Sequence, residues 1–517
     1  TLNEGVRYEI FGAPTETNGR LANFNPLIAA QGPVSATGTF SGFTMPSNFR
    51  GTLPNGVVRT PFAGLYQTPH GDISPRLGFA WQMLQRPLVV LRGGYGIYFD
   101  RHSATLAGQT VNQPPFATLQ FVGGAPNGDA SLQSPFVPLI QPQSSYPLFT
   151  PRTPDSTPFI EGTNPHMLDG RTQEYTLSVE YALGRGYVLS AGYVGTHSGH
   201  RSGQVEFDQA ALASPSNPVN GETTNSVANV SARMPIQGVS QGSLFTDSVF
   251  IGNYNSLQAS LRRQMQYGLA VEASYTWSKN LDEVNGEGGI DVFELQLPTN
   301  DQHHLRQSSY GPAGDDRAQR FVANFHWQTP ALHEGPGVVR YALTGWQFSG
   351  IGVIQSGSAL SVFDANAGSV YGLISGEVRA QRAPGNPSPV MHGSTYSRVI
   401  QGYLNPAAFT RAPEVANGTS LADQDFGNSG VGIVRGPGQH SADMAVERSF
   451  PVAEVSSIRF RAEFFNVTNT AQFGNPNTSL GYSDPTLPNP SPSPTFGKIT
   501  STNANPRVIQ FAMRYQF

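Results

Sequence analysis

Two short segments contain residue types that could support catalysis or bind a metal ion. Gly238-Val239-Ser240-Gln241-Gly242 matches the nucleophile-elbow pattern, in which a strained turn between a strand and a helix exposes the serine. Its flanking residues predict neither that strand nor that helix, so we interpret the segment as a surface loop. The pair His303-His304, with Asp301 nearby, offers groups that suit divalent cations. Adjacent histidines rarely point toward one ion, so we predict a solvated loop, no metal site and no catalytic residue.

A third segment combines opposite charges next to a predicted strand. Asp315, Asp316, Arg317 and Arg320 lie just before an alternating segment that begins at Phe321. Charges at the end of a loop can fix the start of a strand by pairing, so we expect an ion-paired cluster; contact with a substrate is the alternative. A Gly-rich run at 427–438 lacks the strand-to-helix context of a phosphate-binding loop, and no cofactor is predicted.

The composition excludes several classes of protein. Gly and Pro contribute 57 and 41 of the 517 residues, and only 13% are charged, which argues against a coiled coil and against a highly charged disordered chain. The absence of cysteine excludes disulfide frameworks and thiolate chemistry. A net charge of −4 with two lysines gives no basic surface for nucleic acid, and we predict no nucleic-acid partner. No run approaches the roughly 18 apolar residues of a transmembrane helix.

Apolar residues instead recur at every second position in many segments. Tyr175, Leu177 and Val179 alternate with polar residues, and the pattern resumes at Tyr187 after Gly184-Arg185-Gly186, as expected for a β-hairpin with a tight turn. Twelve segments have this period, which a helix does not produce. They span 2–10, 77–83, 89–99, 175–183, 187–193, 256–262, 269–277, 321–327, 346–355, 444–450, 458–464 and 509–517.

Short and long connections alternate strictly between these segments. Five are short turns, and the others are long and rich in Gly, Pro, Asn, Ser and Thr: 12–72, 101–173, 196–255, 278–319, 356–442 and 468–508. A soluble sandwich has little reason for this arrangement, whereas outer-membrane barrels have short periplasmic turns and long extracellular loops. We therefore predict an all-β fold, an antiparallel transmembrane β-barrel that occupies residues 1–517.

Charged residues in the predicted strands should then face the lumen, because an arginine that faces lipid at mid-membrane costs about 2–4 kcal/mol. This expectation applies to ten positions, namely Arg76, Arg92, Glu174, Glu180, Arg262, Glu272, Arg459, Arg461, Glu463 and Arg514.

Several segments resemble the barrel of Oar-like TonB-dependent transporters. They are 74–81 (SPRLGFAW), 91–100 (LRGGYGIYFD), 254–258 (YNSLQ), Asp316-Arg317 before Phe321-Val322, 460–467 (FRAEFFNV) and 473–476 (FGNP). The resemblance covers nearly the whole chain. It implies the C-terminal part of a 22-stranded barrel, of which about twelve strands are visible, in the outer membrane of a Gram-negative organism. Proteins of this type are common in acidobacterial genomes. Lipid and lipopolysaccharide would surround the barrel.

The same resemblance implies a function for the longer parent rather than for these residues alone. The plug, the TonB box and the signal peptide of that family have no counterpart here, so TonB would be engaged only through a missing N-terminal part. The implied role is uptake of an unidentified extracellular ligand, without enzymatic activity. A structural or adhesive outer-membrane protein is the alternative, and a secreted β-rich enzyme or lectin is a third reading.

The last segment is similar to the signal that the barrel-assembly machinery captures. It places apolar or aromatic residues at alternate positions up to the final residue: Ile509, Phe511, Met513, Tyr515 and Phe517. Capture of such a strand would use its exposed backbone edge for pairing and its alternate side chains for specificity.

Overall fold

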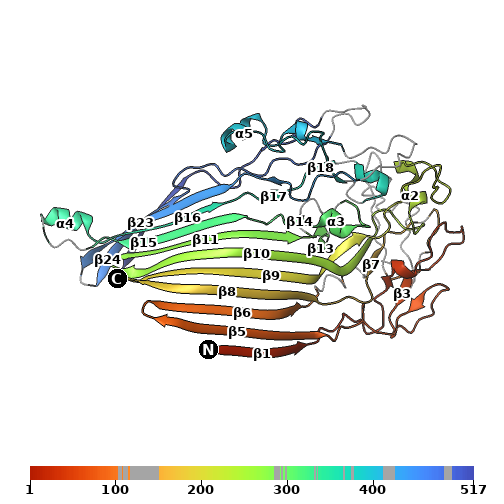
Figure 1. Cartoon of the computed structure of the whole chain (residues 1–517), viewed down its shortest axis with the longest axis horizontal. Helices are drawn as coiled ribbons and strands as arrows, with labels where there is room; N and C mark the ends of the chain where they lie inside the picture. The colour runs from red at the N-terminus through yellow and green to blue at the C-terminus, as the bar shows by residue number, and fades with distance from the viewer. Residues whose placement is uncertain are drawn as a thin grey trace.

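The computed structural model describes residues 1–517 except 103–107, 109–114, 117–148, 150, 156, 285–290, 293–294, 297–299, 331–333, 335, 365–366, 374–377, 412–425, 454 and 482–491. Its dominant element is one large antiparallel sheet, in which twelve strands lie side by side in chain order (Figure 1). They are β1 (Leu2–Glu9), β5 (Asp72–Gln85), β6 (Leu88–Asp100), β8 (Gly170–Gly184), β9 (Tyr187–Glu206), β10 (Leu244–Gln266), β11 (Leu269–Asp282), β15 (Gln319–Gln328), β16 (Trp346–Gln355), β23 (Gln439–Ala453), β24 (Ser456–Phe465) and β25 (Val508–Gln516).

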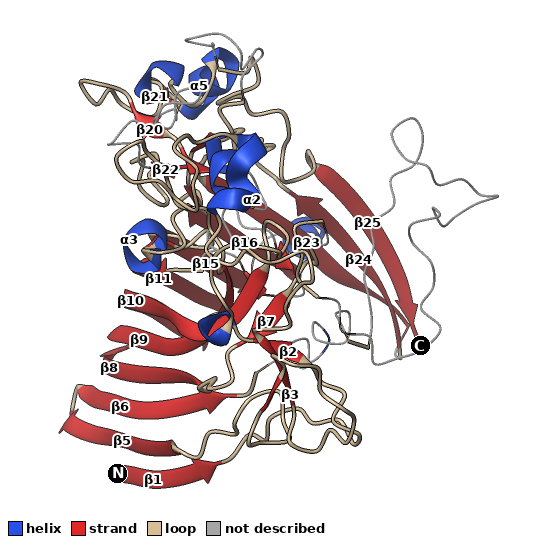
Figure 2. Ribbon diagram, turned by 90° about the vertical axis from the view of Figure 1, so that its right-hand side faces the viewer, coloured by secondary structure: helices blue, strands red, loops and turns tan. Residues whose placement is uncertain are grey.

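The sheet is strongly curved and has two free edges. Its strand order begins at β1 and ends at β25, and these two strands do not pair with each other. Figure 2 shows the sheet bending from β1 through β10 and round to β25, so that it forms an open trough. The twelve predicted strands and their antiparallel order are confirmed.

The short connections include two-residue turns in which both residues have positive φ. Arg185 and Gly186 join β8 to β9 with φ of 51° and 77°, and Tyr267 and Gly268 join β10 to β11 with 52° and 78°. Both positive angles are typical of the hairpin turn whose twist matches that of the strands, and glycine adopts them without steric strain. The predicted tight turn after Leu183 is therefore confirmed.

The strand register separates a polar face from an apolar face. Residues directly opposite in neighbouring antiparallel strands share a face. Arg76 lies in one row with Gly96 and Glu174, Arg262 lies opposite Glu272, and Arg459 lies opposite Arg514. Followed across the sheet, this register places all ten predicted lumenal charges on the concave polar face, which confirms the expectation. The opposite face is apolar and exposed; Leu177 and Phe511, for example, are 51% and 67% exposed.

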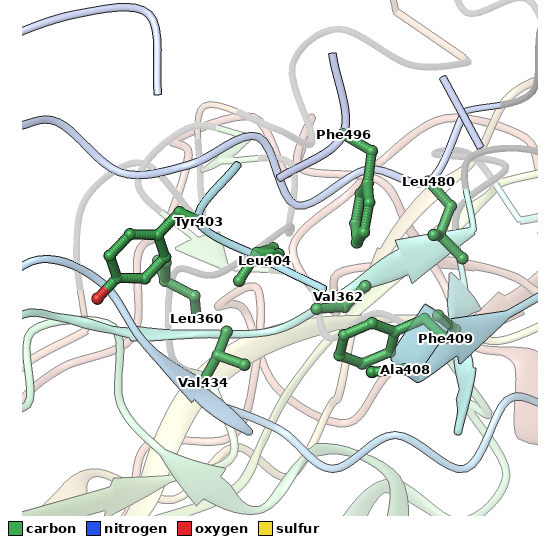
Figure 3. Packing of buried hydrophobic residues seen from close by; sticks show 10 residues of the cluster. Leu360, Val362, Tyr403, Leu404, Ala408, Phe409, Val434, Leu480 and Phe496 are labelled. Carbon is green, nitrogen blue, oxygen red and sulfur yellow. The ribbon is translucent and has the colours of Figure 1, made fainter. Parts of the chain in front are cut away.

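The buried apolar core lies in the long connections and not in the sheet. The largest cluster brings together Leu360, Val362, Leu404, Phe409 and Leu480, which come from two different loops (Figure 3). A second cluster joins three other loops through Phe24, Ile160 and Met234. The long loops thus form a folded cap at one end of the sheet (Figure 1).

The cap contains short elements that the alternation pattern does not predict. Its strands are β2 (Asn23–Phe24), β3 (Phe43–Met45), β4 (Val58–Arg59), β7 (Glu161–Thr163), β12 (Asp291–Val292), β13 (Leu295–Gln296), β14 (Gly311–Pro312), β17 (Ala359–Leu360), β18 (Phe363–Asp364), β19 (Val378–Arg379), β20 (Gln381–Arg382), β21 (Phe409–Thr410) and β22 (Val434–Arg435). The α-helices are α2 (Val230–Arg233), α3 (Leu305–Ser309) and α5 (Thr395–Gln401), with α4 (Gly337–Leu343) at the opposite end. In the described part of the chain, none of these helices has the length and apolarity to cross a membrane.

Strand lengths correct the predicted boundaries. β9 and β10 continue through 196–206 and 244–255, which were predicted as loop. Near the cap both faces of these strand ends are covered by protein, so the simple alternation stops although the backbone pairing continues.

Candidate functional site

The four charged residues predicted at the rim lie where β11, β14 and β15 meet at the cap end of the sheet. β14 pairs with the last residues of β11, and a turn at 313–318 then leads into β15. Asp316 and Asp315 both accept hydrogen bonds from Asn280 of β11. The Asp316 Oδ1 atom accepts one from the Asn280 backbone N–H (2.6 Å), and the Asp315 Oδ1 atom accepts one from the Asn280 side chain (2.9 Å). These contacts fix the start of β15.

The ion pair of this cluster has a partner that the sequence analysis missed. Asp316 is 1% exposed and pairs with Arg435 in β22, which also donates from Nη1 to the Asp316 carbonyl oxygen (3.0 Å). No ion pair joins Asp315, Asp316, Arg317 and Arg320 to one another. The predicted pairing is therefore wrong in its partner, because a residue 119 positions away supplies the cation. The pair connects two of the long loops.

Arg317 and Arg320 have different surroundings. The Arg317 guanidinium donates to the backbone oxygens of Gly314 and Asp316, at 3.2 and 3.1 Å, and so closes the turn on itself. Arg320 stands on the polar face of β15, opposite Thr276 and Gln355. Its guanidinium lines a pocket instead of stabilising the turn.

That pocket lies on the polar face below the cap and has a volume of about 600 Å³. An ion pair between Arg201 of β9 and Asp282 of β11 (3.0 Å) forms part of its wall. The other lining side chains are polar or charged, apart from Gly252: Thr196, Ser198, Asn253, Tyr254, Thr276, Ser278, Asn280, Asp315, Asp316, Arg317 and Arg320. Acidic, basic and hydroxyl-bearing residues thus line the same pocket, which suits a polar ligand with many hydrogen-bonding groups.

The other sequence candidates lie in loops. Ser240 sits in consecutive turns, and its backbone N–H donates to the Pro158 carbonyl oxygen (2.9 Å), so the strand and helix of a nucleophile elbow do not flank it. The Asp301 Oδ2 atom pairs with His304 Nδ1 (2.7 Å), and the His304 side chain is 65% exposed. Within the residues that the structure describes, no group of three or more His, Asp or Glu side chains could hold a metal ion.

Several acidic groups are buried inside the cap. Asp208 accepts a hydrogen bond at Oδ1 from the Ile236 backbone N–H (2.7 Å), while its buried Oδ2 atom has no hydrogen-bond partner. Burial raises the pKa of Asp208 to about 7, although the Ile236 hydrogen bond and the nearby Arg152 oppose this shift. The carboxyl group is therefore largely protonated in mildly acidic solution.

A second buried acid group lies where β5, β6 and β8 reach the cap. Burial, followed by the neighbouring Asp72 carboxyl group, raises the pKa of Asp169 to about 7. His102 lies 3.6 Å from Asp169, measured from Nε2 to Oδ1, and its Nδ1 atom is hydrogen-bonded to Ser202 (2.7 Å). Burial lowers the pKa of His102, which favours the neutral imidazole beside the Asp169 carboxyl group.

The predicted assembly residues occupy the apolar face of the last strand. Ile509, Phe511, Met513 and Tyr515 lie opposite apolar residues of β24, and the Phe511 ring stacks on Phe460 at 6.2 Å. Phe517 follows the strand, stacks on Tyr515 at 5.8 Å and is 95% exposed. The backbone edge of β25 away from β24 pairs with no other described strand.

These observations define a class of protein. A curved antiparallel sheet with an exposed apolar outer face, a charged concave face, short turns at one end and long loops at the other is typical of membrane-spanning β-barrels. The family model of the outer membrane beta barrel domain matches residues 1–510, and the chain belongs to that family. It is therefore an outer-membrane protein of Gram-negative type, whose apolar face contacts lipid.

Comparison with solved structures gives matches that cover most of this chain but a minor part of the others. The outer membrane transporter YddB from Escherichia coli is 8% identical, with a TM-score of 0.42, over 87% of this chain and 41% of that one. FpvA from Pseudomonas aeruginosa bound to heterologous pyoverdines is 11% identical, with a TM-score of 0.36, over 88% and 34%. The ferric-catecholate import receptor Fiu from Escherichia coli is 8% identical, with a TM-score of 0.33, over 90% and 39%.

This chain thus spans about two fifths or less of the length of these structures. No sequence among the curated proteins matches it.

Proposed function

We propose that the chain is the barrel portion of a TonB-dependent outer-membrane transporter of the Oar-like type, which takes up an unidentified extracellular ligand and performs no catalysis. Residues 1–517 would form one barrel domain. The observation that carries the proposal is the polar pocket of about 600 Å³ on the concave face, directly below the cap. The pocket lies at the cap end of the sheet, where a ligand that enters between the loops would meet the polar face.

Arg320 is the residue that we expect to contact the ligand. The Arg317 guanidinium is used within its own turn, and Asp316 is paired with Arg435, whereas Arg320 only lines the pocket in the described part of the chain. An arginine at this position offers five N–H donors to carboxylate, phosphate or hydroxyl oxygens.

An adhesive role is the second candidate, and the packed cap is the observation that favours it. Loops with a buried core of their own, including Leu360, Leu404 and Phe409, present a defined outer surface to another cell or a solid support. In that role the lumenal pocket would have no function.

Growth on defined media separates the two roles. Strains that lack the gene, lack TonB, or carry Arg320→Ala are compared with wild type on iron chelates, polysaccharides or peptides as the limiting nutrient. Transport predicts that all three grow poorly on the same nutrient. Arg92→Ala is the matched control, since Arg92 also faces the lumen but pairs with Glu180 (3.2 Å) away from the pocket. Normal growth of the deletion strain on every nutrient, with loss of surface attachment, would support adhesion instead.

Partner interactions follow from the same assignment. Lipopolysaccharide would contact the outer leaflet half of the apolar face, TonB would act through residues upstream of this chain, and the barrel-assembly machinery would recognise β25. The exposed edge of β25 and the aligned side chains of Phe511, Met513 and Tyr515 support the last of these.

A further inference from the structure

A helix lies on the outer side of the barrel wall at the end that carries the short turns. α4 belongs to the connection between β15 and β16 and projects beyond the strand ends at the far left of Figure 1. Short turns of outer-membrane barrels are periplasmic, so α4 lies at the periplasmic surface of the membrane. Its apolar side chains are exposed, and Val338, Tyr341 and Leu343 are 82%, 58% and 54% exposed.

The C-terminal end of α4 is held onto the lipid-facing side of the sheet. The Ala342 carbonyl oxygen accepts hydrogen bonds from Trp346 Nε1 (2.7 Å) and from Arg448 Nη1 (3.0 Å), and Arg448 also donates to the Tyr341 carbonyl oxygen. Arg448 lies opposite Trp346 and Phe460, which places it on the apolar face. The helix therefore covers an arginine on the lipid-facing side of the wall, and that arginine anchors the helix.

The rings around Arg448 make this attachment rigid. Its guanidinium carbon lies 4.8, 5.3 and 4.7 Å from the ring centres of Tyr341, Trp346 and Phe450, and the residue is only 6% exposed. Cation–π contacts of this kind gain strength when water is excluded. The position of α4 relative to the sheet is thus fixed by hydrogen bonds and ring contacts together.

A groove of about 520 Å³ lies between α4 and the sheet. Trp327, Trp346, Phe348 and Val446 of the sheet line it, together with Thr329 and Pro330 after β15 and Leu343 at the C-terminal end of α4. The Trp327 and Phe348 rings stack at 5.4 Å, and none of the described side chains that line the groove is charged. The volume falls within the roughly 300–1,000 Å³ that is usual for small-molecule sites.

We propose that this groove binds one acyl chain of a phospholipid from the inner, periplasmic leaflet of the outer membrane. The sheet residues that line it belong to the same lipid-facing face as the rest of the barrel wall, because Trp327 and Phe348 lie opposite each other and Phe348 lies opposite Val446. The groove is therefore continuous with the membrane interface. A chain here would contact Leu343 of α4 in addition to the residues of the wall.

Quenching of tryptophan fluorescence by brominated phosphatidylethanolamine tests the proposal. The chain contains Trp81, Trp277, Trp327 and Trp346. In bilayers with increasing fractions of the brominated lipid, a W81F/W277F variant of the full chain reports on the groove. A W327F/W346F variant reports on the flat lipid-facing wall, because Trp81 and Trp277 are exposed there at 58% and 59%.

A dedicated site predicts that the groove tryptophans reach half-maximal quenching at a lower fraction of brominated lipid than the wall tryptophans. If the groove buries one more methylene group of a lipid chain than the wall does, lipid should prefer the groove over the wall by about fourfold. Leu343→Asp, which places a charge in the groove, and Val446→Phe, which fills it, should each abolish the preference in the W81F/W277F background. Val338→Asp, on the free side of α4, should preserve it.

Two results would overturn the proposal. Superimposed quenching curves for the two pairs would show that the groove is ordinary lipid-contacting surface. Groove tryptophans that resist quenching would show that protein covers them, such as a second copy of the chain. Heat-dependent migration on a denaturing gel verifies that each variant is folded, and two differently acting groove substitutions keep the test decisive if one of them prevents folding.

Discussion

Replacement of Asp208 by asparagine should remove a pH dependence from the stability of the cap. The pKa of this carboxyl group rises from an ordinary value of 3.8 to about 7 in the folded cap. The folded state therefore binds the proton more tightly than the unfolded state does. The stabilisation is complete below about pH 4, decreases as the unfolded state ionises above that pH, and is lost by about pH 7.

The magnitude follows from the width of this interval. About three pH units at ~1.4 kcal/mol each correspond to roughly 4 kcal/mol between pH 4 and pH 8. In Asp208→Asn the amide oxygen can still accept the hydrogen bond from the Ile236 backbone N–H, and no charge is buried at any pH. We expect the variant cap to be more stable than wild type at pH 8, by up to about 4 kcal/mol, and to be similar at pH 4. Loss of attraction to Arg152 reduces this gain.

Hydrogen exchange measured by mass spectrometry provides the assay. Peptides from 207–243 are followed between pH 5 and pH 8, with correction for the intrinsic exchange rate, because local opening of the cap need not require unfolding of the sheet. Asp155→Asn, which removes an exposed carboxyl group, is the matched control and should leave exchange within 207–243 unchanged. Equal protection of wild type and Asp208→Asn at pH 8, or lower protection of the variant, would refute the reasoning.

Four further predictions concern other parts of the chain. Asp316→Asn leaves Arg435 without its anionic partner and should destabilise the cap by about 1–3 kcal/mol, seen as faster proteolysis within 356–438, whereas Asp315→Asn should have a smaller effect. Asp72→Asn should lower the pKa of Asp169 from about 7, so that the pH dependence of exchange near 66–72 moves to lower pH; an unchanged profile would contradict the proximity of the two carboxyl groups. Gly268→Ala should reduce stability more than Gly186→Ala: both have positive φ, which costs about 1 kcal/mol for alanine, but only at Gly268 would the added Cβ collide with a backbone oxygen, that of Gln328. Deletion of Phe517 should lower the amount of assembled barrel severalfold while Phe517→Tyr retains it, and equal assembly of the deletion variant would exclude a role for the terminal ring in capture.

The sheet was predictable because its physical requirements repeat at every second residue. A lipid-facing position and a lumen-facing position have opposite polarity, so Tyr175, Leu177 and Val179 identify one face of β8 and Glu174 and Glu180 the other. Turns with two positive φ angles favour residues such as Gly186, so the glycine itself predicted the position of the turn.

The cap was not predictable because its contacts are long-range and have no period. Leu360 and Leu480 share one buried cluster although 120 positions separate them, and Arg435 reaches Asp316 across two loops. Arg448 is a residue for which the sequence does carry a signal. It occupies an apolar position of the alternation that includes Met444 and Val446, and an arginine there requires a cover such as α4.

The position of the buried core has a consequence for how the chain becomes stable. Leu404 and Phe409 are sequestered from water inside the cap, whereas Leu177 and Phe511 leave water only when lipid covers the sheet. The hydrophobic effect in water therefore stabilises the cap, whereas contact with the bilayer stabilises the wall. The two parts can differ in their response to a single perturbation, since urea acts on the cap directly while lipid thickness and detergent act on the wall. Substitutions in the loops can accordingly change which extracellular molecules the protein contacts without changing the contacts between its wall and lipid.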